Sequence, residues 1–370
     1  MTLWTRFEQL FKKWGMRLLE GILGKAPLHP EDFMPETVNK ILVIRQHDQL
    51  GDLLLSTPVL RALRQHFPEA HIALLVRNYT HEVVKYNQYI NEVIVFQEIG
   101  YNWTLNKFKK FIKKIFTPRD LTIVLNTVSH SFTSDLFAFF SRAPYILGSK
   151  HLLFPGCKRN FFYNLHAPYR RGIRNQSERN LDIVRYLGIN TVDPGEHITL
   201  LDEEVRWANK ALAQAGVRDN ELVIGIHPGA GKIRNRWDVS NFAQAANSLH
   251  QTYNAKIIIN CGSNEHLLVD SLVVQLKCEP IIFENLDLRQ LAALISRYDL
   301  FLCNDTGVLH VAAAVGTPLV VIFGPTDPLQ WKPIGERFIA VRGINRSCNS
   351  VSVEEVLQKA EMLLGENPET

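Results

Sequence analysis

The stretch Tyr298–Trp331, YDLFLCNDTGVLHVAAAVGTPLVVIFGPTDPLQW, predicts a strand–turn–helix–strand unit. Leu300–Cys303 and Leu319–Phe323 are apolar runs of strand length. Between them, Asn304–Gly307 has the composition of a tight turn. A short helix is expected from about 308 to 315, where a glycine ends it and a proline follows. Because the turn follows the carboxyl end of the first strand, it lies where open α/β sheets bind their ligands.

This turn has two interpretations. The free backbone N–H groups at the start of the helix suit a phosphate, and Gly307 lets a ligand approach the backbone closely. Alternatively, Asp305 is an ordinary N-cap in a structural turn, which explains the same residues about equally well. The spacing alone does not decide between a phosphate site and a helix cap.

Three consecutive motifs in this stretch resemble a known signature. They are Asp-Thr-Gly-x-x-His, Ala-Ala-x-Gly-x-Pro and Phe-Gly-Pro-Thr-Asp-Pro-x-x-Trp. Together they resemble the donor site of glycosyltransferase family 9, the ADP-heptose:lipopolysaccharide heptosyltransferases and their relatives. The resemblance covers about residues 38–345. It implies the GT-B architecture, an α/β fold with two Rossmann-like domains facing across a cleft.

Length and composition agree with two domains. The chain has 370 residues, of which 46% are hydrophobic, enough for two cored domains of about 100–200 residues each. No apolar run reaches the roughly 18 residues that span a bilayer, and the N-terminus carries charges in every turn, unlike a secretory signal. The five cysteines are scattered and lack C-x-x-C spacing, as expected for reduced thiols of a cytoplasmic protein.

The charge is unevenly distributed. Residues 1–190 hold 26 Lys and Arg against 15 Asp and Glu, whereas residues 191–370 hold 15 against 22. The basic half is expected to meet an anionic partner such as a membrane, a phosphorylated glycolipid or a nucleic acid. A chance asymmetry of solvated faces is the alternative.

Buried strands alternate with helices in both halves. Strands are expected at 40–45, 72–76, 93–96, 121–126, 222–226, 256–260 and 280–283, with a helix from Asp52 to about Phe67. Continuous apolar strands of this kind indicate parallel sheets covered on both faces. We therefore expect an amphipathic helix and linker at 1–37, an N-terminal acceptor-binding Rossmann-like domain at 38–190, a C-terminal nucleotide-sugar-binding Rossmann-like domain at 191–345 and a C-terminal helix at 346–370.

Two basic amphipathic helices are expected in the first half. In residues 1–25, large apolar side chains recur at three- and four-residue steps, namely Trp4, Phe7, Phe11, Trp14, Leu18 and Ile22. With cations on the remaining surface, a membrane-interface helix is favoured over one docked on the protein's own core. Within residues 101–118, five lysines alternate with Phe and Ile, and an anionic lipid surface and a solvated basic face explain the pattern equally well.

A third basic region is rich in loops. It comprises Lys158, Arg159, Arg170, Arg171, Arg174 and Arg179, with Glu178 as the one acid between residues 158 and 179. The fork geometry of arginine suits phosphates or sugar carboxylates, so Arg170, Arg171 and Arg174 are predicted to bind the acceptor. A nucleic-acid footprint is disfavoured because no helix-turn-helix, zinc-finger, RRM or KH signature occurs.

Asp48 and Asp52 are the candidate carboxylates for proton transfer. They lie in DQLGD directly after the first strand, where a carboxylate beside a glycine is well placed to accept a proton. Capping of a helix is the alternative role for Asp52. Followed by Ser-Thr-Pro, the motif resembles the family's D-x-x-G-D…T-P. That resemblance implies that Asp52 is the general base, which deprotonates the acceptor hydroxyl for one inverting displacement; Asp48, beside the acceptor, is the second candidate.

His227–Trp237, HPGAGKIRNRW, is the candidate for a second donor loop. Glycines between a strand and a helix can cradle phosphates, and nearby cations can neutralise a leaving diphosphate. The loop resembles the family's x-P-G-A-x…K-R-W but has Asn235 where a lysine is usual. Lys232, Arg234 and Arg236 are the candidate replacements, and a surface loop with incidental cations is the alternative interpretation.

The resemblance implies a donor site assembled from several loops. Glu265 matches a family acid that binds the ribose, and Leu286 lies in the segment that lines the nucleobase. His310 matches a donor contact, although a histidine satisfied within the core is the alternative. The predicted donor-binding residues are Gly229, Ala230, Gly231, Lys232, Arg234, Arg236, Glu265, Leu286, Asp305, Thr306, Gly307 and His310.

The resemblance therefore implies an inverting, metal-independent glycosyltransferase that moves heptose from ADP-heptose to a lipopolysaccharide core acceptor. No Asp-x-Asp pair occurs, so helix N-termini and cations are expected to take the role of a metal, and no cofactor is predicted. The absence of a Walker A motif and of a complete G-x-G-x-x-G disfavours kinases and dehydrogenases.

The expected partners are a nucleotide-diphosphate sugar, an anionic lipid-linked oligosaccharide and the inner face of the cytoplasmic membrane, with no nucleic acid. Two alternatives stay open. One is a GT-B transferase that uses another nucleotide sugar for a cell-surface glycan. The other is a catalytically silent, glycolipid-binding member, which the departure at Asn235 keeps open and the retained Asp52 and Asp305 disfavour.

Overall fold

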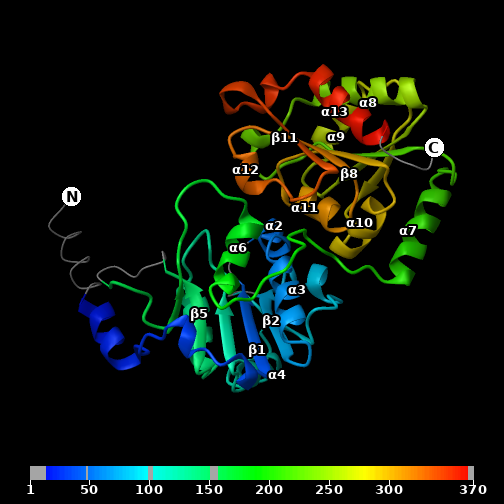
Figure 1. The fold of residues 1–370 in the computed structure, drawn as a ribbon. Helices are drawn as coiled ribbons and strands as arrows, with labels where there is room; N and C mark the ends of the chain where they lie inside the picture. The colour runs from blue at the N-terminus through cyan, green and yellow to red at the C-terminus, as the bar shows by residue number, and fades with distance from the viewer. Residues whose placement is uncertain (1–13, 47–48, 99–102, 151–156, 366–370) are drawn as a thin grey trace. The chain divides into compact units, whose positions relative to one another are not determined.

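The structure, a computed structural model, describes residues 14–46, 49–98, 103–150 and 157–365. The chain forms two compact units (Figure 1). The N-terminal unit comprises residues 1–48, 56–81 and 87–194, and the C-terminal unit comprises residues 49–55, 82–86 and 195–370. Two short segments from the first quarter of the chain thus belong to the C-terminal unit.

The N-terminal unit contains a parallel six-stranded sheet. Its strands are β1 Lys40–Arg45, β2 His71–Arg77, β3 Glu92–Phe96, β4 Leu121–Val124, β5 Tyr145–Ser149 and β6 Leu165–Ala167. They lie in the order β3-β2-β1-β4-β5-β6. The order reverses between β1 and β4, so their carboxyl ends form the switch point where doubly wound sheets bind ligands.

Helices cover both faces of this sheet. They are the helix at residues 14–23, α3 Thr57–His66, α4 Leu105–Ile115, α5 Phe132–Phe140 and α6 Gln176–Arg185. Alternate side chains of the strands, such as Leu42 and Ile44, form one core layer with the 14–23 helix, α4 and α5. On α3, seven consecutive residues are buried, and this helix packs beside α6. Burial on both faces explains why the strands are apolar throughout.

The C-terminal unit repeats the same topology. Its strands are β7 Val223–His227, β8 Lys256–Cys261, β9 Ile281–Glu284, β10 Leu300–Asn304, β11 Leu319–Phe323 and β12 Phe338–Arg342. All pair in parallel in the order β12-β11-β10-β7-β8-β9. The switch point here lies between β7 and β10, and β10 is the first strand of the stretch that predicts the fold.

The helices of this unit are α2 Leu50–Leu54, α7 Asp202–Gln214, α8 Val239–Tyr253, α9 His266–Val273, α10 Leu288–Ile295, α11 Gly307–Ala314, α12 Pro328–Trp331 and α13 Val353–Gly365. The closing helix α13 lies beside α8 (Figure 1) and packs its buried side chains, including Val356 and Ala360, into the core of the unit.

The remaining helices described in the two units are single 3₁₀ turns: η1 Pro30–Asp32, η2 Pro35–Thr37, η3 His81–Val84, η4 Ile233–Asn235, η5 Ile344–Arg346 and η6 Cys348–Ser350.

Several expected elements need correction. The single helix from Asp52 to Phe67 is wrong: the chain forms α2, turns at residues 55–56 and begins α3. A proline at the second position of α3 favours a new helix start there. The N-cap of α11 is Thr306 and not Asp305, which leaves the Asp305 carboxylate for other contacts. The strands β5, β6 and β12 and the helix α9 had not been expected.

The predicted fold class is confirmed, since both units are parallel α/β sheets of Rossmann-like order, as in a GT-B fold. The additional N-terminal helix is present at residues 14–23, whereas Trp4, Phe7 and Phe11 lie outside the described residues. Among the residues that the structure describes, no helix combines the length and apolar character needed to cross a bilayer.

Candidate active site

The predicted donor residues gather at one edge of the C-terminal sheet. Gly229, Ala230 and Gly231 follow β7, Glu265 follows β8, and Leu286 follows β9. Asp305 and Thr306 follow β10, and Gly307 begins α11. Because all six strands are parallel, these loops share the carboxyl edge of the sheet. The structure thus brings together residues that span about eighty positions of sequence.

Asn304 links the two central loops at the switch point. Its amide Nδ2 donates to the carbonyls of Pro228 at 2.8 Å and Gly229 at 3.3 Å, and its Oδ1 accepts from the backbone N–H of Trp237 at 2.9 Å. Asn304 is fully buried. A side chain with three hydrogen bonds inside the protein fixes the distance between the glycine loop and the turn before α11.

Asp305 is held from two sides. Its Oδ2 accepts a hydrogen bond from the Thr326 hydroxyl and one from Asn235 Nδ2 at 3.4 Å. Burial raises the pKa of Asp305, and Thr326, His310 and Lys232 oppose that shift. Asn235, the position that departs from the family pattern, is therefore a buried neutral donor to this carboxylate. The Oδ1 atom of Asn235 has no hydrogen-bond partner among the described residues.

Glu265 lies against the glycine loop. A Cβ placed on Gly229 would come within 1.7 Å of the Glu265 carboxylate, so in this arrangement the carboxylate occupies the space that a side chain at position 229 would need. The carboxylate accepts from the Gly262 N–H at 2.9 Å and lies 3.7 Å from Nε2 of His227. The other ring nitrogen of His227 is 2.9 Å from the Asn260 carbonyl. Loops after β7 and β8 therefore form one continuous surface.

The three candidate cations differ in their surroundings. Lys232 and Arg234 are exposed. Arg236 instead donates from Nε and a terminal nitrogen to the Ala230 carbonyl at 3.1 and 3.0 Å. Arg236 therefore stabilises the glycine loop, while Lys232 and Arg234 have the freedom to reach a phosphate.

His310, at the end of the first turn of α11, forms a buried pair with Glu196. Its Nδ1 lies 2.9 and 3.1 Å from the two carboxylate oxygens, and the His310 and Glu196 side chains are 5% and 1% exposed. Burial lowers the pKa of His310, but Glu196, together with Asp305 and Asp52, raises it above the ordinary value. Burial raises the pKa of Glu196, and His310 opposes that shift. The Glu196 carboxylate thus favours the protonated form of His310.

Helix α2 places Asp52 near the His310–Glu196 pair. This helix belongs to the C-terminal unit and packs against α11. A Cβ on Gly51 would lie 2.4 Å from Cδ2 and 3.0 Å from Nε2 of His310, so the imidazole edge opposite Glu196 abuts this glycine. Asp52 is half-buried and accepts from the Gln49 N–H at 3.2 Å. The structure thus brings Asp52 and His310 together, although 258 positions separate them.

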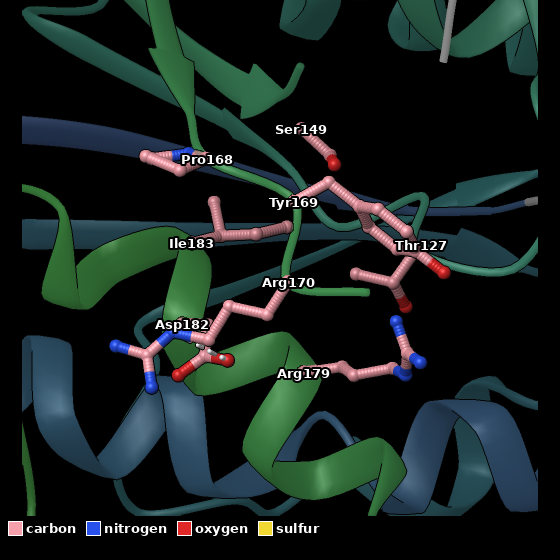
Figure 2. A pocket seen from close by; sticks show the side chains of 8 residues that line it. All are labelled: Thr127, Ser149, Pro168, Tyr169, Arg170, Arg179, Asp182 and Ile183. Carbon is pink, nitrogen blue, oxygen red and sulfur yellow. Dashed lines mark ion pairs between the residues drawn. The ribbon is translucent and has the colours of Figure 1, made fainter. Parts of the chain in front are cut away.

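A pocket lies at the carboxyl edge of the N-terminal sheet. It is lined by Thr127, Ser149, Pro168, Tyr169, Arg170, Arg179, Asp182 and Ile183 (Figure 2). The guanidinium of Arg179 lies over the Tyr169 ring, 5.0 Å from its centroid. Thr127 donates to Asn180 at 2.9 Å, which fixes the polar wall of the pocket. Aromatic, hydroxyl and guanidinium groups together suit a sugar that carries an anionic group.

The predicted acceptor residues differ in their relation to this pocket. Arg170 lines it and lies 3.8 Å from Asp182, the ion pair drawn in Figure 2. Arg174 pairs with Asp182 at 2.8 Å and with Glu178 at 2.9 Å, so much of its charge is neutralised within the protein. Arg171 is exposed. Asp48 lies outside the described residues.

Three contributors had not been predicted. Glu196 comes from the segment between the two halves, and no local motif marks it. Asn304 lies in the opening stretch, where a polar residue at the end of an apolar strand was the available signal. Arg179 lies within the predicted basic region, and its position one turn into α6 could have indicated a wall of the pocket.

Two Rossmann-like units, each a parallel six-stranded sheet with a switch point, define a protein of the GT-B fold class. Comparison with known families gives the more specific assignment. Residues 129–360 match the family described as "Glycosyltransferase family 9 (heptosyltransferase)". The chain belongs to this family.

Related sequences agree with this membership. The chain is 28% identical over 298 residues to lipopolysaccharide heptosyltransferase 3 of Escherichia coli K12, covering 78% of this chain and 84% of the relative. It is 25% identical to lipooligosaccharide heptosyltransferase 2 of Campylobacter jejuni, covering 77% and 81%.

Solved structures share the fold. A glycosyltransferase family 9 protein from Veillonella parvula superimposes with a TM-score of 0.79 at 24% identity, covering 90% of this chain and 99% of the other. E. coli ADP-heptose lps heptosyltransferase II superimposes with a TM-score of 0.69 at 21% identity, covering 88% of this chain and 99% of the other. E. coli heptosyltransferase WaaC, solved with ADP, superimposes with a TM-score of 0.63 at 16% identity, covering 87% of this chain and 97% of the other.

Proposed function

We propose that this glycosyltransferase moves a heptose from ADP-heptose to a lipopolysaccharide core acceptor, with inversion and without a metal. Two observations support this proposal. Relatives that cover most of the chain are named lipopolysaccharide or lipooligosaccharide heptosyltransferases. A structural neighbour was solved with ADP, and the loops that match the predicted donor site share one sheet edge in this chain.

The donor diphosphate would bind at the start of α11. Unpaired N–H groups in the first turn of this helix favour an anion, and its N-cap Thr306 makes no side-chain cap hydrogen bond. Lys232 and Arg234 would approach from the glycine loop. Glu265 would accept from the ribose hydroxyls, with Leu286 beside the base. The sequence has no Asp-x-Asp pair, so these protein groups would carry the charge of the leaving diphosphate.

Asp52 would act as the general base. In this mechanism the acceptor hydroxyl oxygen attacks the anomeric carbon while the Asp52 carboxylate takes the hydroxyl proton. The bond between the anomeric carbon and the diphosphate oxygen breaks, and the diphosphate leaves with the electron pair. A positioned base of this kind contributes about 10²–10⁴-fold to a rate. The His310 imidazolium would offset the negative charge that develops on the leaving group.

The acceptor would bind in the N-terminal unit. The pocket with Arg170 and Arg179 suits an anionic sugar. The exposed Arg171 would add positive charge for the acceptor, and Arg174 would bind it by exchanging its contacts with Asp182 and Glu178. Because a lipopolysaccharide precursor is anchored in a bilayer, we also propose that the enzyme acts as a peripheral protein at the inner face of the cytoplasmic membrane.

The observation that carries this proposal is the packing of α2 on α11, which joins the candidate base to the helix of the candidate diphosphate site. The test is a transfer assay with ADP-heptose and a truncated lipopolysaccharide core, followed by ADP release and mass spectrometry of the product. UDP-glucose and GDP-mannose serve as competing donors, and added EDTA tests whether the reaction requires a metal ion. Transfer of heptose in the presence of EDTA is expected. If transfer occurred only from another donor, heptose would be wrong as the donor sugar, but the assignment as a glycosyltransferase would stand.

One observation favours a second candidate, a catalytically silent member that binds glycolipid. Asn235 occupies the position where the family pattern has a lysine, and this neutral side chain donates to Asp305. An absence of turnover with every donor, combined with tight binding of a lipopolysaccharide core, would favour this alternative. Release of ADP that is lost in Asp52→Asn would exclude it.

A further inference from the structure

The helix at residues 14–23 presents two different sides. Met16, Leu19 and Leu23 pack against the core of the N-terminal unit. Trp14, Leu18 and Ile22 recur every fourth residue on another side and are 73%, 66% and 69% exposed. A stripe of three large apolar side chains, each about two thirds exposed or more, is not needed for packing and indicates a surface that meets an apolar phase.

This helix is firmly attached to the unit. The Lys25 N–H donates to the Phe161 carbonyl at 3.0 Å, and the Leu28 N–H to that of Asn164 at 2.8 Å. Lys25 Nζ reaches the Ala143 carbonyl at 2.7 Å, and Glu20 lies 3.9 Å from Arg159. The exposed stripe therefore has a fixed orientation relative to the sheet.

Helix α4 covers the same face of the sheet. Its Phe111 and Ile115 are buried in the core layer that also contacts Met16, Leu19 and Leu23. Helices that cover one face of a sheet expose their outer sides on that side of the sheet, rotated relative to one another by the twist of the strands. The outer side of α4 carries Lys109, Lys110 and Lys113, with Lys107 at one border. Leu105, at the other border, is 69% exposed.

The positive charge of α4 is largely uncompensated. Lys114 pairs with Glu92 at 2.9 Å, but no described acidic side chain forms an ion pair with Lys107, Lys109, Lys110 or Lys113. The helix itself contains no acid. Lysines attract an anionic bilayer across a few ångströms of water, whereas an exposed Trp, Leu and Ile stripe gains free energy once it enters the headgroup boundary.

We propose that the outer sides of the 14–23 helix and α4 form one membrane-docking face, which binds a bilayer of anionic lipids. The 14–23 helix inserts Trp14, Leu18 and Ile22, and α4 supplies the electrostatic attraction through its four lysines. The 14–23 helix is thus both docked on the protein's own core and membrane-bound, through different sides. This inference deepens the proposed peripheral membrane location and rests on it.

The test measures flotation of the full-length protein with vesicles of phosphatidylethanolamine, phosphatidylglycerol and cardiolipin, and with vesicles of phosphatidylcholine alone. One variant combines Trp14→Gln, Leu18→Gln and Ile22→Gln. A second combines Lys107→Gln, Lys109→Gln, Lys110→Gln and Lys113→Gln. Matched controls on the C-terminal unit remove exposed apolar groups (Leu267→Gln, Val274→Gln, Leu329→Gln) or exposed cations (Arg206→Gln, Lys210→Gln, Lys277→Gln, Arg297→Gln).

The wild type and both controls should float with anionic vesicles and stay unbound with phosphatidylcholine. The lysine variant should lose at least about 100-fold in partitioning, since each surface lysine contributes several-fold near an anionic bilayer. The apolar variant should lose at least about 10-fold and bind more weakly as salt rises, because only electrostatic attraction is left. Unchanged flotation of both variants, or equal losses in the controls, would overturn the proposal.

Two further measurements distinguish a loss of membrane docking from a loss of folding or of activity. Circular dichroism and thermal unfolding check that each variant is folded. Transfer to a delipidated, water-soluble core acceptor should be unchanged in both variants, so a failure of the proposed activity is distinguished from a failure of docking. Concentration-dependent dimers that dissociate in the apolar variant, without vesicle binding by the wild type, would assign the face to a second copy of the chain and contradict the proposal.

Discussion

The two units have the same sheet topology, but the carboxyl edges where we propose that ligands bind differ in kind. At the switch point of the C-terminal sheet, buried groups hold one another through short-range hydrogen bonds, as Asn304 and the Glu196–His310 pair illustrate. At the edge of the N-terminal sheet, arginines and acids form partly exposed ion pairs, such as Arg170–Asp182. One Rossmann-like frame thus carries a preorganised site and an adaptable one.

This difference suits the two proposed substrates. A nucleotide diphosphate has a fixed shape, and a preorganised site avoids the cost of ordering side chains when it binds. A branched, lipid-anchored glycan varies in conformation, and long arginine side chains on a surface can adjust to it. The comparison predicts that changes at the C-terminal edge act on the reaction and on stability together, whereas changes at the N-terminal edge act on acceptor binding alone.

The largest effect is expected for Asp52→Asn. Loss of the base should lower kcat by about 10³-fold, within the range of general-base catalysis, while the Kd for ADP changes little. Steady-state kinetics and isothermal titration calorimetry measure the two quantities. Glu221→Gln, a change at an acid paired with Lys256, is the control. If Asp52→Asn retained more than a tenth of the wild-type kcat, another group would be the base.

Next in size is Asn304→Ala, which removes three hydrogen bonds at a fully buried position. We expect the free energy of unfolding to fall by about 2–4 kcal/mol, since buried backbone groups are left unsatisfied. ADP affinity should fall with it, because the glycine loop and the turn before α11 are no longer fixed to each other. Urea unfolding measures the free energy of unfolding, and calorimetry measures the affinity for ADP. A loss of stability without a loss of ADP affinity would show that Asn304 does not position the donor loops.

At the N-terminal edge, Arg179→Gln is expected to raise the acceptor KM about 10-fold, the size expected for a lost charge-assisted hydrogen bond. Stability and the Kd for ADP should be unaltered. Arg179→Lys keeps the charge but lacks the planar fork, so it should recover only part of the loss. A change in ADP affinity of the same size would contradict the division of roles between the two edges.

The smallest effect concerns pH. Because the pKa of His310 is raised in the folded protein, its protonated form adds stability that is fully present below the pKa of an unfolded histidine and is lost as pH rises through the raised pKa. ADP affinity should decline over the same window. In Glu196→Gln the decline should move to lower pH, since the carboxylate that favours the imidazolium is gone.

Calorimetric titration of ADP from pH 6 to 9, together with the NMR titration of His310, measures this shift. Glu221→Gln again serves as the control. A purely structural role for Glu196 would lower stability at every pH without moving the midpoint of the ADP titration.

The sequence by itself determined the fold class and the positions, after successive strands, of most residues that we propose to bind the donor. Strand β10, its turn and α11 are encoded by neighbouring residues, because an apolar run followed by Asn-Asp-Thr-Gly has few alternatives in the local chain geometry. Local patterns also place Gly229 and Glu265 after strands, and parallel pairing then carries them to one edge. Such features depend on short-range preferences, which sequence expresses directly.

Only the tertiary structure decided which side chains meet. Glu196 pairs with His310 across 114 positions, and Asn235 donates to Asp305 across 70, although neither partner has a local signal for the other. The helix at 14–23 likewise looked like a choice between core and membrane until packing assigned one side to the core. Contacts between distant segments depend on how the sheets and helices pack, and that is determined by the burial of the whole unit and not by any single stretch.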